Sequence, residues 1–249
     1  MTPHDVHPPS GPHALEGEEP GPMCSSGRRP EAVVFDLDGL ILDTEWGIYE
    51  AARAAFEAHG HSLTIEAWST IIGINGAVDD AWWERLCTAA GVTGFDRVLF
   101  DATYDLQDRS SRDRMPALPG VVGLLTALRD ARVPVGIASS SSRGWVSRHV
   151  ARLELVEHFA TLVGADVVGG VGKPAPDVYL RACADLGADP RRSVALEDSA
   201  HGAAAAKAAG MAVVAVPSRI TIHNDFAQAD LVVDSLTELS VDRLAALLP

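Results

Sequence analysis

Two kinds of segment alternate along the second half of the chain: short β-branched apolar runs, and longer stretches with apolar residues at helical spacing. One further apolar run lies near the start. Strands that alternate with helices are typical of a parallel sheet with helices on both faces. The sequence therefore predicts an α/β fold. Strands are expected at 32–35, 133–138, 161–163, 194–196, 212–216 and 231–233, and helices at 121–131, 144–153, 176–186, 200–209 and 236–248.

The segment between residues 46 and 115 shows only the helical pattern. A wholly helical block between two strand-containing regions indicates an inserted domain. Prolines at 116 and 119 indicate a hinge where this block ends. Its helices are predicted at 46–59, 64–72, 79–90 and 95–112, the last with Val98, Leu99, Ala102 and Leu106 facing inward.

Residues 1–29 are rich in Pro, Gly, Ser, His and Glu. They carry too few apolar residues to offset the entropy of ordering, so a disordered tail is expected. The predicted organisation is a tail (1–29), a sheet-containing core (30–45 and 116–249) and an inserted helical cap (46–115).

The chain has 34 acidic and 20 basic residues, a net charge of −14, which argues against nucleic-acid binding through a broad basic surface. Its three cysteines (Cys24, Cys87 and Cys183) are widely spaced, as in a reduced protein without disulfides or a zinc site. No apolar run approaches the roughly 20 residues of a membrane span, and no secretory signal pattern is present. We expect a cytoplasmic protein without nucleic-acid or membrane partners.

Carboxylates follow two of the predicted strands. Asp36 and Asp38 come after 32–35, and Glu197 and Asp198 come after 194–196. The carboxyl ends of parallel strands share one edge of the sheet, where open α/β folds bind ligands. Oxygen ligands suit Mg²⁺. Both pairs also have a plainer explanation, because Asp-x-Asp-Gly is a common turn composition and acids stabilise helix N-termini.

Hydroxyl groups and one lysine complete this set. Ser139 and Ser140 follow a predicted strand just before a helix, where hydroxyls and N–H groups bind phosphate; serines there also cap helices. Lys173, between Gly172 and Pro174, is interpreted as a positioned charge rather than a solvated one. Because an acidic site repels a phosphorylated substrate, a metal is expected there.

The stretch Asp-Leu-Asp-Gly-Leu-Ile-Leu-Asp-Thr-Glu at 36–45 resembles the first motif of the haloacid dehalogenase (HAD) superfamily, in its β-phosphoglucomutase-like phosphatase branch. Lys-Pro-x-Pro-Asp at 173–177 and Glu-Asp-Ser-x-x-Gly at 197–202 resemble further motifs of that branch. The resemblance runs from about residue 32 to about residue 248. It implies a Rossmann-like core with a helical cap, and an Mg²⁺-dependent phosphatase acting on a small phosphorylated metabolite.

The resemblance also implies roles for the matched residues. Asp36 is expected to attack phosphorus and form an aspartyl-phosphate. Asp38 is expected to protonate the leaving alcohol and then to deprotonate water. Lys173 and Ser139 are expected to hold the phosphoryl group. Substrate contacts are thus expected from Ser139, Ser140, Lys173 and Glu45, and metal ligands from Asp36, Asp38 (through its backbone carbonyl), Glu197 and Asp198.

Three other functions compete with the phosphatase. A dehalogenase is disfavoured by Asp38, because halide leaves without a proton. A β-phosphoglucomutase is disfavoured because a histidine of that enzyme falls at Ile48 here, and a cap arginine at about Gly76. A catalytically silent scaffold requires the loss of catalytic groups, and none is lost. The sequence indicates neither the physiological substrate nor the oligomeric state.

Overall fold

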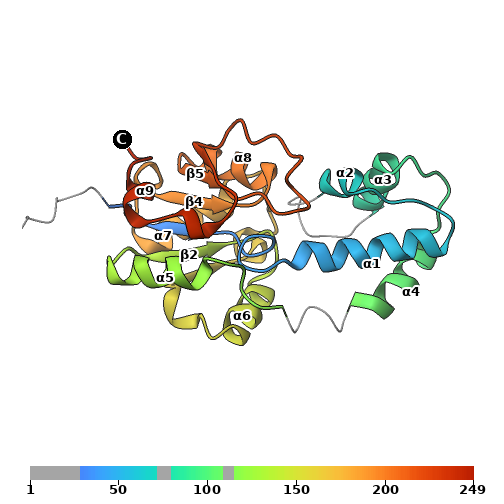
Figure 1. Ribbon diagram of the computed structural model, residues 1–249, viewed down its shortest axis with the longest axis horizontal. Coiled ribbons are helices and arrows are strands. Elements are labelled where there is room, and N and C mark those ends of the chain that lie inside the picture. Colours follow the sequence, from blue (N-terminus) through green and yellow to red (C-terminus); the bar gives the residue numbers. More distant parts are fainter. Residues whose placement is uncertain (1–28, 72–79, 109–114) are drawn as a thin grey trace, which may run out of the picture.

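The computed structural model describes residues 29–71, 80–108 and 115–249, and its body is a six-stranded sheet in the order β3-β2-β1-β4-β5-β6 (Figure 1). Every neighbouring pair of strands is parallel. The predicted α/β fold is therefore confirmed, with β1 at an interior position. The strands are β1 (Val33–Phe35), β2 (Val135–Ala138), β3 (Thr161–Val163), β4 (Val194–Glu197), β5 (Ala212–Ala215) and β6 (Leu231–Val232).

Helices cover both faces of the sheet. Alternate side chains of a strand point to opposite faces, so Val33 and Phe35 pack on one face of β1 and Val34 packs on the other. The first face packs against α5, α6 and α9, and the second against α7 and α8. These helices are α5 (Val121–Asp130), α6 (Arg143–Arg152), α7 (Asp177–Leu186), α8 (Ala200–Ala208) and α9 (Val241–Ala245).

Four helices, which we call the lid helices, form a group beside the sheet-containing body (Figure 1). They have their own apolar cluster, in which Phe56 meets Trp83, Phe95 and Phe100 edge to face. This arrangement supports the predicted inserted cap. The division of the chain into separate domains stays a prediction. The lid helices are α1 (Thr44–Ala58), α2 (Ile65–Ser69), α3 (Asp80–Ala89) and α4 (Arg97–Asp108).

The inward face predicted for α4 is wrong. Val98 is 73% exposed, Leu99 is 48% exposed and Ala102 is also exposed; the side chain of Leu106 lies outside the described residues. Among residues 97–102, whose side chains the structure describes, the buried one is Phe100, which contacts Trp83 and Phe56. The helix face that carries Phe100 packs on the lid helices, because burying an aromatic ring removes more apolar area from water than burying Val98 or Leu99.

The single closing helix predicted at 236–248 is also wrong. The chain instead forms a 3-10 turn at Leu236–Glu238 and then α9. Ser235 makes a capping box with Glu238, and the Ser240 hydroxyl accepts the Arg243 N–H at the start of α9. Each serine caps the start of its own helical element, and because the two caps are only five residues apart, the segment forms two short elements instead of one helix.

Several sequence-based predictions fall outside the described residues. They concern residues 1–28 of the predicted tail, which include Cys24, and the loop that contains Gly76. Among the described residues Cys87 and Cys183 are free thiols, as expected. No helix of the described part of the chain is long and apolar enough to cross a membrane. The cytoplasmic location stays a prediction.

Candidate active site

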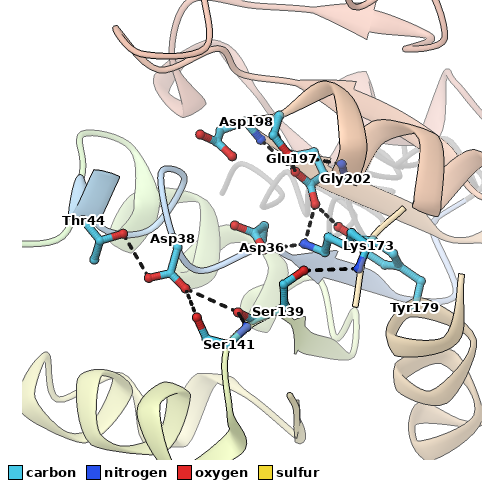
Figure 2. Close-up of polar contacts among 12 residues, drawn as sticks. Asp36, Asp38, Thr44, Ser139, Ser141, Lys173, Tyr179, Glu197, Asp198 and Gly202 are labelled. Atoms are coloured by element: carbon cyan, nitrogen blue, oxygen red, sulfur yellow. Dashed lines mark hydrogen bonds and ion pairs between the residues drawn. The ribbon is translucent and has the colours of Figure 1, made fainter. Parts of the chain in front are cut away.

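Most of the predicted site residues lie at the ends of three adjacent strands, and Lys173 lies in the loop before α7. The strands β2, β1 and β4 are neighbours in the sheet. The residue that directly follows the carboxyl end is Ser139 for β2, Asp36 for β1 and Asp198 for β4. Parallel strands bring these ends to one edge of the sheet. Figure 2 shows Asp36, Lys173, Glu197, Asp198 and Ser139 gathered at that edge.

Lys173 is the centre of a buried ionic cluster. Its Nζ donates to carboxylate oxygens of both Asp36 and Glu197, and the Tyr179 hydroxyl donates to the same Glu197 oxygen at 2.5 Å. Lys173 is 2% exposed and Glu197 is fully buried. A buried charge is tolerated when it is paired and hydrogen-bonded. Lys173 is thus a buried and paired charge, and its expected contact with the phosphoryl group stays a prediction.

The cluster holds more negative than positive charge. Burial raises the pKa of Asp36 to about 8; Lys173 opposes this shift, and Glu197 and Asp38 add to it. Burial alone would lower the pKa of Lys173, but Asp36 and Glu197 outweigh it and raise the pKa above its ordinary value. Lys173 therefore stays charged. One cation does not balance the carboxylates around it.

Asp36, Glu197 and Asp198 place carboxylate oxygens within 4.8 Å of one another, and all three residues are buried. Gly39 leaves the room that this cluster needs, because a Cβ there would collide with the Asp198 carboxylate, and its φ of +89° favours glycine. An all-oxygen donor set with surplus negative charge fits a hard divalent cation.

The side chain of Glu197 faces the protein as well as this cluster. One of its oxygens accepts from the N–H groups of Asp198 and Ser199 and from the Ser199 hydroxyl. A Cβ at Gly202 would collide with this carboxylate, so the glycine of the Glu-Asp-Ser-x-x-Gly motif makes room for it. These contacts hold Glu197 where it meets Lys173. Its predicted place at the metal stays a proposal.

Asp38 lies apart from the Lys173 cluster and faces Thr44 and Ser141 (Figure 2). Its Oδ1 accepts from the Thr44 hydroxyl at 2.9 Å and from the Trp145 indole N–H at 3.0 Å. Its Oδ2 accepts from the Ser141 hydroxyl at 2.8 Å and from the Ser139 hydroxyl at 3.4 Å. The side chain is therefore held as a hydrogen-bond acceptor beside the carboxylate cluster, and its expected role as an acid and base stays a prediction.

The other predicted substrate contacts are Ser139, Ser140 and Glu45. Ser139 is buried, and its oxygen also accepts the Ser141 N–H at 3.0 Å. The Ser140 hydroxyl accepts a hydrogen bond from the backbone N–H of Lys173 at 3.2 Å and so anchors the loop that carries this lysine. The side chain of Glu45 lies outside the described residues. At the lid junction, Asp43 pairs with Arg219.

Four residues at this edge were missed by the sequence interpretation: Tyr179, Ser141, Trp145 and Thr221. The Thr221 hydroxyl donates to the backbone carbonyl of Asp198 at 2.5 Å. Tyr179 and Trp145 each lie in the first turn of a helix that follows a recognised motif, a signal that the sequence did contain. Thr221 lies in a loop without a motif, and only the fold brings it to the site.

The chain is similar to known proteins over most of its length. The family model for haloacid dehalogenase-like hydrolases matches residues 30–210. YhcW of Bacillus subtilis (strain 168), provisionally named a phosphatase, is 36% identical over 222 residues, covering 85% of this chain and 94% of YhcW. Hexitol phosphatase B of Escherichia coli (strain K12) is 32% identical over 226 residues, covering 88% of this chain and 99% of that protein.

Solved structures share the fold. A HAD family hydrolase from Deinococcus radiodurans R1, with bound phosphate and sodium, aligns with a TM-score of 0.70 at 29% identity, covering 89% of this chain and 98% of that one. A β-phosphoglucomutase from Clostridium difficile aligns with a TM-score of 0.69 at 23% identity, covering 87% and 98%. On the family match and the phosphatase-named relatives, the chain belongs to the haloacid dehalogenase-like hydrolases.

Proposed function

We propose that this enzyme hydrolyses a small organic phosphomonoester through an aspartyl-phosphate on Asp36, with Mg²⁺ as cofactor. The observation that carries the proposal is the buried Asp36–Lys173–Glu197 cluster, with Asp198 and Asp38 at the same edge of the sheet. A carboxylate held next to a charged lysine is suited to attack a phosphoryl group, because that lysine also attracts the incoming anion.

In the first step an Asp36 oxygen attacks phosphorus, and the bond between phosphorus and the alcohol oxygen breaks. Asp38 gives its proton to that departing oxygen. In the second step water attacks the aspartyl-phosphate, Asp38 takes a proton from it, and inorganic phosphate leaves with Asp36 restored. Lys173 and Ser139 hold the phosphoryl oxygens through both steps, so most of the rate enhancement comes from positioning and electrostatics.

Asp36 and Asp198, with the backbone carbonyl of Asp38 and help from Glu197, are the proposed holders of Mg²⁺. When bound, this ion supplies positive charge that offsets the repulsion between the carboxylates and the phosphoryl oxygens. The lid helices are proposed to exclude water from the site and to select the substrate. The name of one relative makes hexitol phosphates the first metabolites to test.

Chelation is expected to abolish turnover, and Mg²⁺ to restore it. The reason is that the buried carboxylates outnumber the one lysine that pairs with them. The measurement is phosphate release after dialysis against EDTA, with Mg²⁺ added back in steps. Asp198→Asn should need more Mg²⁺ for half-maximal activity, whereas Asp234→Asn, at an exposed residue, should not. Full activity in chelator would contradict the metal proposal.

A phosphatase and a mutase share the first step and differ in what accepts the phosphoryl group. A mutase must grip a sugar phosphate while it turns around, which requires cationic lid residues near the first motif. At the matching position, Ile48 is apolar and packs against the lid cluster; Gly76 lies outside the described residues.

With β-glucose 1-phosphate and a bisphosphate primer we therefore expect inorganic phosphate or no product. A coupled assay for glucose 6-phosphate, run beside a phosphate assay, distinguishes the two functions. Glucose 6-phosphate formed faster than phosphate would favour the mutase. A scaffold without catalysis is disfavoured, since every motif acid and the motif lysine are present.

A further inference from the structure

The Asp38 carboxylate accepts hydrogen bonds of two different kinds. Thr44, Ser141 and Ser139 contribute hydroxyl groups, which can donate or accept by rotating. Trp145 contributes an indole N–H, which can only donate. Of these partners, the indole is the one that can bond the carboxylate only as a donor.

The indole of Trp145 is held in place from several sides. It packs against the apolar core on the sheet face that α5, α6 and α9 cover. The ring centroids of Trp145 and His149 are 4.2 Å apart, and the Arg148 guanidinium carbon lies 4.9 Å from the Trp145 ring centroid. Its backbone N–H donates to the Ser142 hydroxyl, the N-cap of α6. The indole N–H is therefore presented from the first turn of a helix. It keeps its direction when the carboxylate exchanges protons.

We propose that Trp145 is a positioning residue for Asp38, an inference that rests on the proposed function. The indole N–H donates to Oδ1 at 3.0 Å and so fixes the orientation of the carboxylate. On the other side of the carboxylate, Oδ2 accepts from the Ser141 and Ser139 hydroxyls at 2.8 and 3.4 Å. Trp145 thus holds the orientation in which Asp38 meets the departing alcohol and the attacking water.

The test compares two leaving groups of similar size. In benzyl phosphate the alkoxide must be protonated as it departs, whereas the nitrophenolate of p-nitrophenyl phosphate leaves without a proton. The ratio of their kcat/KM values therefore reports the general acid in the first step. A substitution that merely loosens the fold changes both values by the same factor.

Trp145→Phe is expected to lower kcat/KM for benzyl phosphate about tenfold, a part of the roughly 10²–10⁴-fold that a general acid contributes. It should lower kcat/KM for p-nitrophenyl phosphate less than about twofold, since that reaction bypasses the acid. Benzothienylalanine placed at position 145 keeps the shape of the ring and removes only the N–H. It should reproduce the effect even if Trp145→Phe is poorly folded.

Two controls separate positioning from packing. Trp68→Phe changes another buried tryptophan, whose indole N–H has no hydrogen-bond partner among the described residues; it should affect both substrates equally. In an Asp38→Asn background, Trp145→Phe should produce no further difference between the substrates, because the two residues act through one group.

An equal loss for both substrates, or a difference that persists in Asp38→Asn, would overturn the role of Trp145 while leaving the proposed function intact. If the wild-type enzyme with Mg²⁺ hydrolyses neither substrate, the proposed function itself fails. If Asp38→Asn shows the difference between substrates and Trp145→Phe does not, only the positioning role is rejected.

Discussion

Asp36→Asn is expected to lower kcat by about 10⁴-fold or more, the scale seen when a nucleophile is removed from an active site. The amide has nearly the same shape but no anionic oxygen to attack phosphorus. It can still accept the hydrogen bond from Lys173. The measurement is single-turnover phosphate release together with a search for phosphorylated protein, which should be present in the wild type and absent in the variant.

The same substitution should not weaken the fold. Burial raises the pKa of Asp36 to about 8 from its ordinary value of 3.8, so the folded state favours the protonated form. Ionisation of this group therefore costs stability progressively as pH rises from about 4 to about 8. Asparagine carries no charge, so the melting temperature of the variant in chelator should equal or exceed that of the wild type, with a gap that widens from low to high pH.

Asp130→Asn serves as the control, because the Asp130 side chain is 69% exposed and should change neither turnover nor melting temperature. Normal turnover in Asp36→Asn would reject Asp36 as the nucleophile. A loss of activity accompanied by a lower melting temperature would mean that the residue is needed for the structure instead.

Lys173→Met is expected to cost about 3–5 kcal/mol of unfolding free energy, because it leaves the buried carboxylates of Asp36 and Glu197 without their cation. Turnover should also fall by several orders of magnitude, since the lysine offsets charge on the nucleophile and the phosphate. Urea unfolding in chelator measures the first effect. The loss of stability should shrink at low pH, where the carboxylates take up protons.

Lys207→Met is the matched control. Lys207 also pairs with a carboxylate, that of Asp230, but both side chains are 35% exposed, so the pair should contribute only about 0–1 kcal/mol. Mg²⁺ should recover part of the stability lost in Lys173→Met, because it supplies positive charge to the same carboxylates. Similar losses in the two lysine variants would show that Lys173 is not the counter-ion of the site.

The amino-acid sequence by itself determined the fold class and the residues that gather at the site. Each strand is a short apolar run, and the motif carboxylates and Ser139 lie at the ends of such runs, so strand identity and parallel pairing were sufficient to bring these groups to one edge. Asp36, Ser139, Glu197 and Asp198 are in this category, whereas Lys173 lies in the loop before α7 and was identified from its Gly-Lys-Pro setting and the Lys-Pro-x-Pro-Asp resemblance. Their order along the chain and the turn residues around them are local features, which a sequence displays directly.

The tertiary structure alone decided how these groups are paired. Lys173 meets Asp36 across 137 residues, and Trp145 meets Asp38 across 107. Such contacts depend on which helix packs on which face, and local pattern carries no record of them. The same reason explains the wrong face of α4: several apolar residues competed for burial, and the position of Phe56 and Trp83 selected Phe100. Burial by neighbours distant in sequence likewise sets the pKa of Asp36, because it removes the water that would stabilise the charge.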